Sequence, residues 1–231
     1  MNAIGILLCD IDAKANDSWD ALPNNPYGKY TYEFPVIRET IPGASEQKIV
    51  DSGGDLSMTP HVVNAAKKLE QRGAKAIVGG CGFFAFFQKD ISRVVSVPVA
   101  LSSLLQVPIV FQMIGKDRRV GIITWSKRYL GEQHFNAVGW SSQTIPIAVG
   151  KGLEEFPVWK NQNFGPDKIP LLESVMREIA IDLLKENPDL GAFVYEGAAL
   201  GFTPAIQKAT GLPVFNLATL VRSLYSGVCF T

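Results

Sequence analysis

Short aliphatic runs alternate along the chain with longer segments that mix apolar and polar residues. The runs are rich in valine, isoleucine and leucine and end at glycine, proline or aspartate, which is typical of buried strands. The longer segments repeat apolar residues every three or four positions, as amphipathic helices do. This alternation predicts an α/β fold in which parallel sheets are covered by helices on both faces.

The clearest helix is Thr59–Arg72, because Pro60 suits a first helical position and Gly73 ends the segment. The predicted strands are Ala3–Leu8, Ala76–Val78, Pro98–Leu101, Arg119–Thr124, Thr144–Ala148, Ala192–Tyr195 and Pro213–Asn216, with a less regular one at Tyr32–Arg38. The other predicted helices are Ser102–Gln112, Lys127–Ala137, Pro166–Glu186, Pro204–Ala209 and Leu217–Ser226.

Three pairs of segments repeat at nearly the same distance. The first strand and the strand at Arg119–Thr124 share an Ile/Val-Gly-Ile pattern, with an offset of 116 residues (121 − 5). The segments around Cys81 and Gly197 also match at 116 (197 − 81), and two Pro-Val pairs match at 115 (213 − 98). The repeat predicts two pseudo-symmetric, Rossmann-like parallel-sheet domains. Residues 1–113 with 216–231, the C-terminal helix packed back, would form one half, and 114–215 the other.

The composition narrows the class of protein. Of the 231 residues, 47% are hydrophobic and 19% are charged, which suits a compact globule and excludes a disordered chain. The 22 basic residues balance the 22 acidic ones, so neither nucleic acid nor an anionic membrane is an expected partner. The three cysteines form no metal or disulfide spacing, and no signal peptide or membrane span is predicted. We therefore expect a reduced, cytoplasmic protein.

The two halves predict where a ligand binds. In parallel sheets ligands bind beyond the carboxyl ends of the strands, and two facing halves would enclose a shared cleft there. Cys81 follows a strand directly, between Gly80 and Gly82, at a turn into a helix. The amides and dipole at that helix start would lower the thiol pKa toward neutrality and could hold a carboxylate. The alternative interpretation is that Cys81 is a buried cysteine with a purely structural role.

The segment Ala-Ile-Val-Gly-Gly-Cys81-Gly-Phe-Phe, its counterpart Phe-Val-Tyr-Glu196-Gly197-Ala-Ala and a following Thr-Gly-Leu-Pro-Val-Phe resemble the aspartate/glutamate/hydantoin racemase superfamily. The resemblance spans essentially the whole chain. It implies two α/β halves around a cofactor-free site that acts on a carbon acid next to a carboxylate or carbonyl. It also implies one cysteine from each half, as paired proton donor and acceptor. Cys81 matches the first of these cysteines.

The second cysteine position departs from this pattern, because Gly197 stands there. Glycine transfers no proton, so we expect a one-base reaction with Cys81 as the single thiol, similar in kind to arylmalonate decarboxylase: a decarboxylase, lyase or isomerase. Glu196 is a possible second base, but alternation along the strand argues that it points away from the aligned position. Gly197 would also widen one wall of the site.

Further substrate-binding candidates lie beyond the same strand ends. They are Asp10, Gly82, Phe83, Thr124, Ser126, Gly197 and Ala198. Asp10 could orient a substrate or serve as an ordinary turn residue, and the hydroxyls of Thr124 and Ser126 could bind a carboxylate or cap a helix. Cys9 and Cys229 read better as packing residues. His61 and His134 have no metal-ligand spacing.

The leading hypothesis is therefore a cofactor-independent carbon-acid enzyme that acts on a small carboxylate. Backbone amides after Cys81 and after Glu196, together with Thr124, would stabilise an enediolate. One alternative is an amino-acid or hydantoin racemase with Glu196, or a water that it orients, as second base. Another is a non-catalytic relative that binds a metabolite. The phenylalanine cluster after Cys81 suggests a homo-oligomer, with a dimer as the simplest form.

Overall fold

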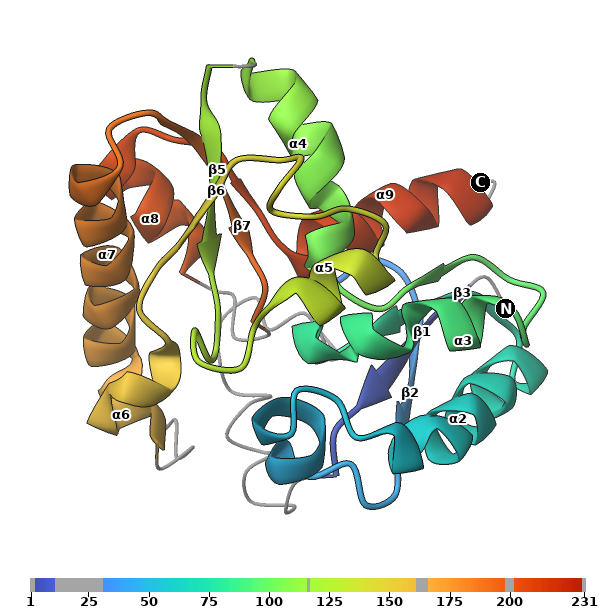
Figure 1. The fold of residues 1–231 in the computed structure, drawn as a ribbon. Coiled ribbons are helices and arrows are strands. Elements are labelled where there is room, and N and C mark those ends of the chain that lie inside the picture. Colours follow the sequence, from blue (N-terminus) through green and yellow to red (C-terminus); the bar gives the residue numbers. More distant parts are fainter. Residues whose placement is uncertain (1–2, 11–30, 116, 161–165, 198–201, 230–231) are drawn as a thin grey trace.

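The computed structural model describes residues 3–10, 31–115, 117–160, 166–197 and 202–229. Its strands form two parallel four-stranded sheets, which occupy separate regions of the molecule (Figure 1). The first sheet has the order β2-β1-β3-β4, with β1 (Ala3–Leu8), β2 (Val36–Thr40), β3 (Ala74–Gly79) and β4 (Val99–Ala100). The second has the order β6-β5-β7-β8, with β5 (Arg119–Ile123), β6 (Ile147–Val149), β7 (Leu190–Tyr195) and β8 (Val214–Phe215).

Helices cover both sheets (Figure 1). The α-helices are α2 (Thr59–Gln71), α3 (Gln88–Ser92), α4 (Val107–Ile114), α5 (Glu132–Ala137), α6 (Pro157–Lys160), α7 (Ile169–Glu186), α8 (Thr203–Thr210) and α9 (Leu217–Val228). Short 3-10 helices span Leu56–Met58, Gly82–Phe87, Ser103–Gln106, Leu153–Glu155 and Pro166–Lys168, and a π-helix spans Gln47–Asp51. None of the helices within the described ranges is long and apolar enough to cross a membrane.

The predicted two-half α/β fold is confirmed at the level of strand register. Ile4 pairs with Ala76 in the first sheet, and Val120 pairs with Ala192 at the corresponding place in the second. Both ladders shift register just before this pair. The same 116-residue offset therefore relates the sequence repeat and the hydrogen-bonded ladders.

Two helices connect the halves, because each follows one sheet in sequence and packs against the other. α4 follows the first sheet in sequence but contacts β5 and β7 of the second, whereas α9 follows the second sheet and contacts β1 and β3 of the first. The predicted domain division stays a prediction, since α4 belongs to the first half by its boundaries and to the second sheet by its contacts.

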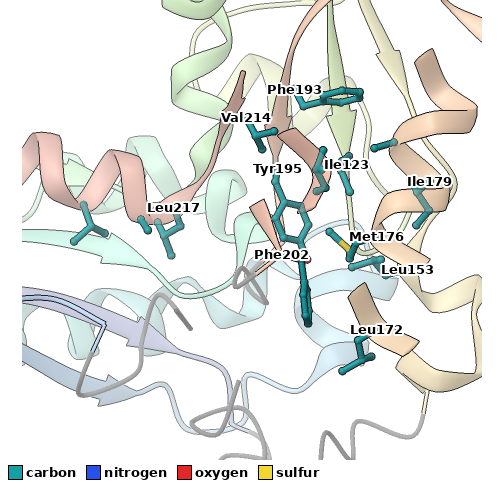
Figure 2. Close-up of a cluster of buried hydrophobic side chains, with 14 of the residues drawn as sticks. Ile123, Leu153, Leu172, Met176, Ile179, Phe193, Tyr195, Phe202, Val214 and Leu217 are labelled. Carbon is teal, nitrogen blue, oxygen red and sulfur yellow. The ribbon is translucent and has the colours of Figure 1, made fainter. Parts of the chain in front are cut away.

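The core of the second half packs against one face of its sheet. Phe193 and Tyr195 from β7, Met176 and Ile179 from α7, and Phe202 are all buried there. Figure 2 shows the Tyr195 ring reaching from β7 toward Phe202. The β7 side chains thus fill the interior of this half, and their packing fixes the position of the carboxyl end of β7.

Two predicted elements begin later than expected. α5 starts at Glu132 rather than at residue 127, because Gly131 is extended (φ −161°, ψ −171°) and interrupts the helix. β6 starts at Ile147 rather than at residue 144, because the amides of Thr144 and Ile145 both bond to the Ser141 carbonyl in a turn. The less regular strand predicted at 32–38 forms instead at Val36–Thr40.

Candidate active site

The carboxyl ends of the central strands carry the polar groups of the site. Cys9 lies one residue beyond β1, and Cys81 lies two residues beyond β3. In the second half Thr124 and Glu196 directly follow β5 and β7. Because the Gly80 amide bonds to Leu7 (2.7 Å) and the Glu196 amide bonds to Ile123 (2.8 Å), Glu196 is the structural counterpart of Gly80, and Gly197 that of Cys81.

Cys81 does not stand alone. Its thiol is hydrogen-bonded to the thiol of Cys9, and both residues are partly buried. Sequence reasoning assigned Cys9 to packing and missed this pair. The pairing depends on β1 and β3 lying side by side in the sheet, which places the two cysteines just beyond neighbouring strand ends. The first half therefore supplies two neighbouring thiols at the carboxyl end of its sheet.

The predicted lowering of the Cys81 pKa is wrong. The hydrogen bond to Cys9, burial, and the charges of Cys9 and Glu196 together raise the pKa of Cys81 well above its ordinary value. The Phe83 amide at the start of the 3-10 helix donates to the sulfur and lowers the pKa, as the sequence suggested, but this effect is the smaller one. These surroundings thus favour the neutral thiol form of Cys81.

The Glu196 side chain is buried at the end of β7, beside the turn that follows β3 in the first half. Its side chain is 2% exposed, and Oε2 accepts hydrogen bonds from the Thr124 hydroxyl (2.7 Å) and the Trp125 amide (3.2 Å). Oε1 lies against the turn after β3, since a Cβ built on Gly82 would stand 2.1 Å from it. Burial raises the pKa of Glu196 to about 7, and the charge of Glu154 adds to this rise.

Other predicted site residues have structural partners. Thr124 is fully buried and its hydroxyl bonds to Glu196, while the Ser126 hydroxyl lies against Glu154. The exposed Asp10 carboxylate accepts a hydrogen bond from the Gly43 amide (2.7 Å) and so holds the loop after β2. Ala198 lies outside the described residues. Of these predicted polar residues, Thr124 thus contacts Glu196 and Ser126 contacts Glu154, whereas Asp10 contacts neither.

Gly82 has a clear role, and Gly197 has a different one from that expected. Gly82 permits the close approach of Glu196, whose backbone oxygen would also stand 2.2 Å from an added Cβ. The space beside Gly197 is taken by the Tyr195 ring, which a Cβ would meet at 2.9 Å, so Gly197 does not widen the site.

The phenylalanines after Cys81 belong to the interior of the subunit. Phe83, Phe84 and Phe87 are fully buried, and the Phe83 ring meets the buried His134 edge-on at 4.9 Å. This cluster therefore gives no support to the predicted homo-oligomer, which stays a prediction. His134 does not gather metal ligands: among the residues that the structure describes, no group of three His, Cys, Asp or Glu side chains is placed to hold a metal ion.

A cavity of about 450 Å³ is lined by residues of both halves. Its lining carries three carboxylates, one indole and one guanidinium: Glu46, Glu154, Glu155, Trp125 and Arg128. Glu46 Oε1 accepts from the Trp125 indole (2.7 Å), which fixes the ring, and the Trp125 amide bonds to Glu196. The cavity lining is thus acidic and aromatic, and Trp125 connects it to Glu196 through the hydrogen bond from its backbone amide.

Comparisons with known proteins found similar proteins both by sequence and by structure. The chain is 28% identical over 207 residues to a dimethylsulfoniopropionate lyase of Durusdinium sp. clade D, covering 84% of this chain and 66% of that protein. It is 25% identical over 215 residues to dimethylsulfoniopropionate lyase 5 of Emiliania huxleyi, covering 85% of this chain and 42% of that protein. The chain therefore spans less than two thirds of the length of both relatives. No model of a known protein family matches it.

Solved structures share the fold over nearly the whole chain. A mutant of arylmalonate decarboxylase superposes with a TM-score of 0.65 at 15% identity, covering 97% of this chain and 94% of that one. Allantoin racemase from Pseudomonas fluorescens gives 0.65 at 11% identity (98% and 90%), and an aspartate racemase homologue from Pyrococcus horikoshii gives 0.61 at 18% (100% of both). The chain therefore shares its fold with arylmalonate decarboxylase, allantoin racemase and the aspartate racemase homologue.

Proposed function

We propose that this protein is a cofactor-independent lyase that removes a proton from the α-carbon of a small carboxylate and expels a neutral group from the β-carbon. The observation that carries the proposal is that the Cys9–Cys81 thiol pair follows the strands of one sheet while Glu196, which follows a strand of the other, lies against the neighbouring Gly82. A thiol at such a place is a candidate general base. The names of the sequence relatives suggest the leaving group.

A β-sulfonium carboxylate such as dimethylsulfoniopropionate is the substrate class that we propose. Such a molecule is a zwitterion, and the neighbouring cavity offers groups of both signs. The carboxylates of Glu46 and Glu154 and the Trp125 ring would attract the sulfonium, since an indole face binds cations. Arg128 would hold the carboxylate. An excess of acidic groups suits this substrate better than an arylmalonate dianion.

The proposed reaction balances without a cofactor. The Cys81 thiol first gives its proton to solvent, and the resulting thiolate takes the α-proton, so an S–H bond forms as the Cα–H bond breaks. The electron pair becomes the Cα–Cβ double bond, the Cβ–S bond breaks, and its electron pair leaves on sulfur. The products from dimethylsulfoniopropionate are acrylate and dimethyl sulfide, and the proton on Cys81 then passes to solvent.

A second candidate is racemisation of a small carboxylate with Glu196 as the opposing base. It is favoured by the position of Glu196, which faces the Cys81 turn from the other half. Both enantiomers would then exchange their α-hydrogen with solvent, whereas a one-base lyase forms an alkene. We also propose a cytoplasmic location, in keeping with three free cysteines.

The test is a substrate panel with the purified chain in deuterated buffer. Dimethylsulfoniopropionate, phenylmalonate, aspartate and allantoin are incubated separately, with headspace gas chromatography for dimethyl sulfide and NMR for acrylate and for α-deuterium. The proposal predicts dimethyl sulfide and acrylate in equal amounts from the first compound. Turnover of phenylmalonate, or deuterium exchange into both enantiomers of aspartate, without any dimethyl sulfide from the first compound would overturn it.

A further inference from the structure

Trp125 joins the two halves of the molecule at the wall of the cavity. Its indole N–H donates a hydrogen bond to Glu46 Oε1 (2.7 Å), which belongs to the first half. Its backbone amide donates to Glu196 Oε2 (3.2 Å), and its carbonyl accepts from the Glu154 amide (3.1 Å), both in the second half. Hydrogen bonds thus reach the side chain of Trp125 from one half and its backbone from the other.

The Trp125 ring also packs on a buried aromatic neighbour. Its centroid lies 6.2 Å from that of the Trp159 ring, and the two planes meet at 85°. Trp159 is fully buried and makes a similar edge contact with Phe202 (6.3 Å, 88°). Such contacts set the separation of the rings. The hydrogen bond to Glu46 adds a directional contact, which sets the rotation of the indole.

Glu46 is itself held in place from the end of β1. The Asp10 amide bonds to the Ala44 carbonyl (3.0 Å), and the Asp10 carboxylate accepts from the Gly43 amide (2.7 Å). Glu46 follows two residues after Ala44 and directly precedes the π-helix, in which Ile49 is fully buried. The loop that carries Glu46 is therefore anchored on both sides, so the position of its carboxylate is well defined.

The charges around the cavity favour a bound cation. Burial, together with the charges of Glu155 and Glu46, raises the pKa of Glu154, because carboxylates of like charge oppose the ionisation of one another. A cation among them relieves this repulsion. The indole face adds an attraction that depends on the position of the ring, since a cation–π contact requires the cation to lie over the ring within about 6 Å of its centroid.

We propose that Glu46 is a positioning residue that holds the Trp125 ring against a bound onium group. The first half thereby sets the cation affinity of a cavity whose other lining groups belong to the second half. The inference rests on the proposed use of this cavity for a β-onium carboxylate. An indole face recognises positive charge and methyl groups rather than sulfur, so an ammonium analogue of the substrate should bind in the same place.

The test is the binding of 3-(trimethylammonio)propionate to the purified chain, measured by isothermal titration calorimetry. This probe carries both charges of the proposed substrate but has no sulfonium. Glu46→Gln loses the charge and keeps an oxygen acceptor for the indole, whereas Glu46→Leu loses both. The dissociation constant should be at least about threefold higher in Glu46→Leu than in Glu46→Gln, because leucine no longer holds the ring.

The control is the same pair of variants combined with Trp125→Phe. Phenylalanine keeps an aromatic ring but has no N–H, so neither change at Glu46 removes a hydrogen bond there. The two dissociation constants should then agree within about twofold. Circular dichroism checks the fold of each variant, and Glu46→Ala takes the place of Glu46→Leu if leucine does not fold.

Three results would overturn the role of Glu46. They are equal dissociation constants of the two variants when Trp125 is present, the same ratio with and without Trp125→Phe, and a parent protein that does not bind the probe. The first would show that only the charge of Glu46 matters, and the second that its effect does not pass through the indole.

The inference and the lyase proposal fail in different ways. Absence of dimethyl sulfide in the substrate panel rejects the lyase, while the calorimetric ratio is measured with a ligand that lacks the sulfonium leaving group. Release of dimethyl sulfide by a protein that does not show the predicted ratio rejects the role of Glu46 alone.

Discussion

Replacing Glu196 by glutamine should change the pH dependence of stability. Glu196 is 2% exposed in the folded protein, and its pKa rises from 4.5 to about 7 on folding. The folded state therefore holds this proton more tightly than the unfolded chain does. Stability from this group is fully present below pH 4.5 and is lost as the pH rises through 7. A shift of this size corresponds to ~3 kcal/mol.

The assay is urea unfolding followed by circular dichroism at pH 5 and at pH 8, under reducing conditions. Glutamine mimics the neutral carboxyl group, so the variant does not lose the stability that the parent loses when buried Glu196 ionises at high pH. Glu196→Gln should therefore stabilise the protein relative to the parent more at pH 8 than at pH 5. The difference between the two pH values in this gain in the free energy of unfolding should be about 2–3 kcal/mol.

The matched control is Glu178→Gln, which changes an exposed carboxylate on α7. Solvent screens a charge there, so its effect should differ by less than about 0.5 kcal/mol between the two pH values. A Glu196→Gln variant whose effect is likewise independent of pH would refute the reasoning, since Glu196 would then be ionised at the same pH in the folded and unfolded states.

Two further substitutions probe the packing and charge of the site. Gly82→Ala should lower the free energy of unfolding by about 2 kcal/mol or more in urea titrations, because its Cβ would overlap Glu196 Oε1 at 2.1 Å; Gly227→Ala on α9, where an added Cβ meets no atom within 4 Å, should be neutral or stabilising. Glu154→Gln should raise the KM for dimethylsulfoniopropionate about tenfold, through loss of an ion pair of ~1.4 kcal/mol, and leave unchanged the inhibition by the isostere 4-methylpentanoate, which keeps the carboxylate but lacks the sulfonium charge. Equal losses for both ligands would place the sulfonium elsewhere.

The repeat made the fold predictable from sequence. Gly5 and Gly121 mark equivalent positions on β1 and β5, and the register of the two sheets follows the same 116-residue offset. Such a repeat predicts the same strand order in both halves, because equivalent strands and helices in the second half pack in the same way as in the first. Element starts were less predictable where a single glycine, Gly131, overrode a helical pattern.

The site was only partly predictable, because its chemistry depends on contacts between segments far apart in sequence. Cys81 was found from its glycine neighbours and strand end, but its pairing with Cys9 requires that β1 and β3 be adjacent. Alternation correctly separates Glu196 from Gly197, yet it does not say which of them lies beside the turn after β3. That choice is made by Tyr195, whose ring takes the space beside Gly197, and by the hydrogen bond from Thr124 to Glu196.

The most direct test of the central claim, that Cys81 is the base, is Cys81→Ala assayed for dimethyl sulfide release from dimethylsulfoniopropionate. The same substitution at Cys229, a buried residue at the end of α9, is the control. Loss of a general base should lower kcat/KM at least a hundredfold, while Cys229→Ala should stay within about threefold of the parent. A Cys81→Ala variant that keeps activity within about tenfold of the parent would contradict the account.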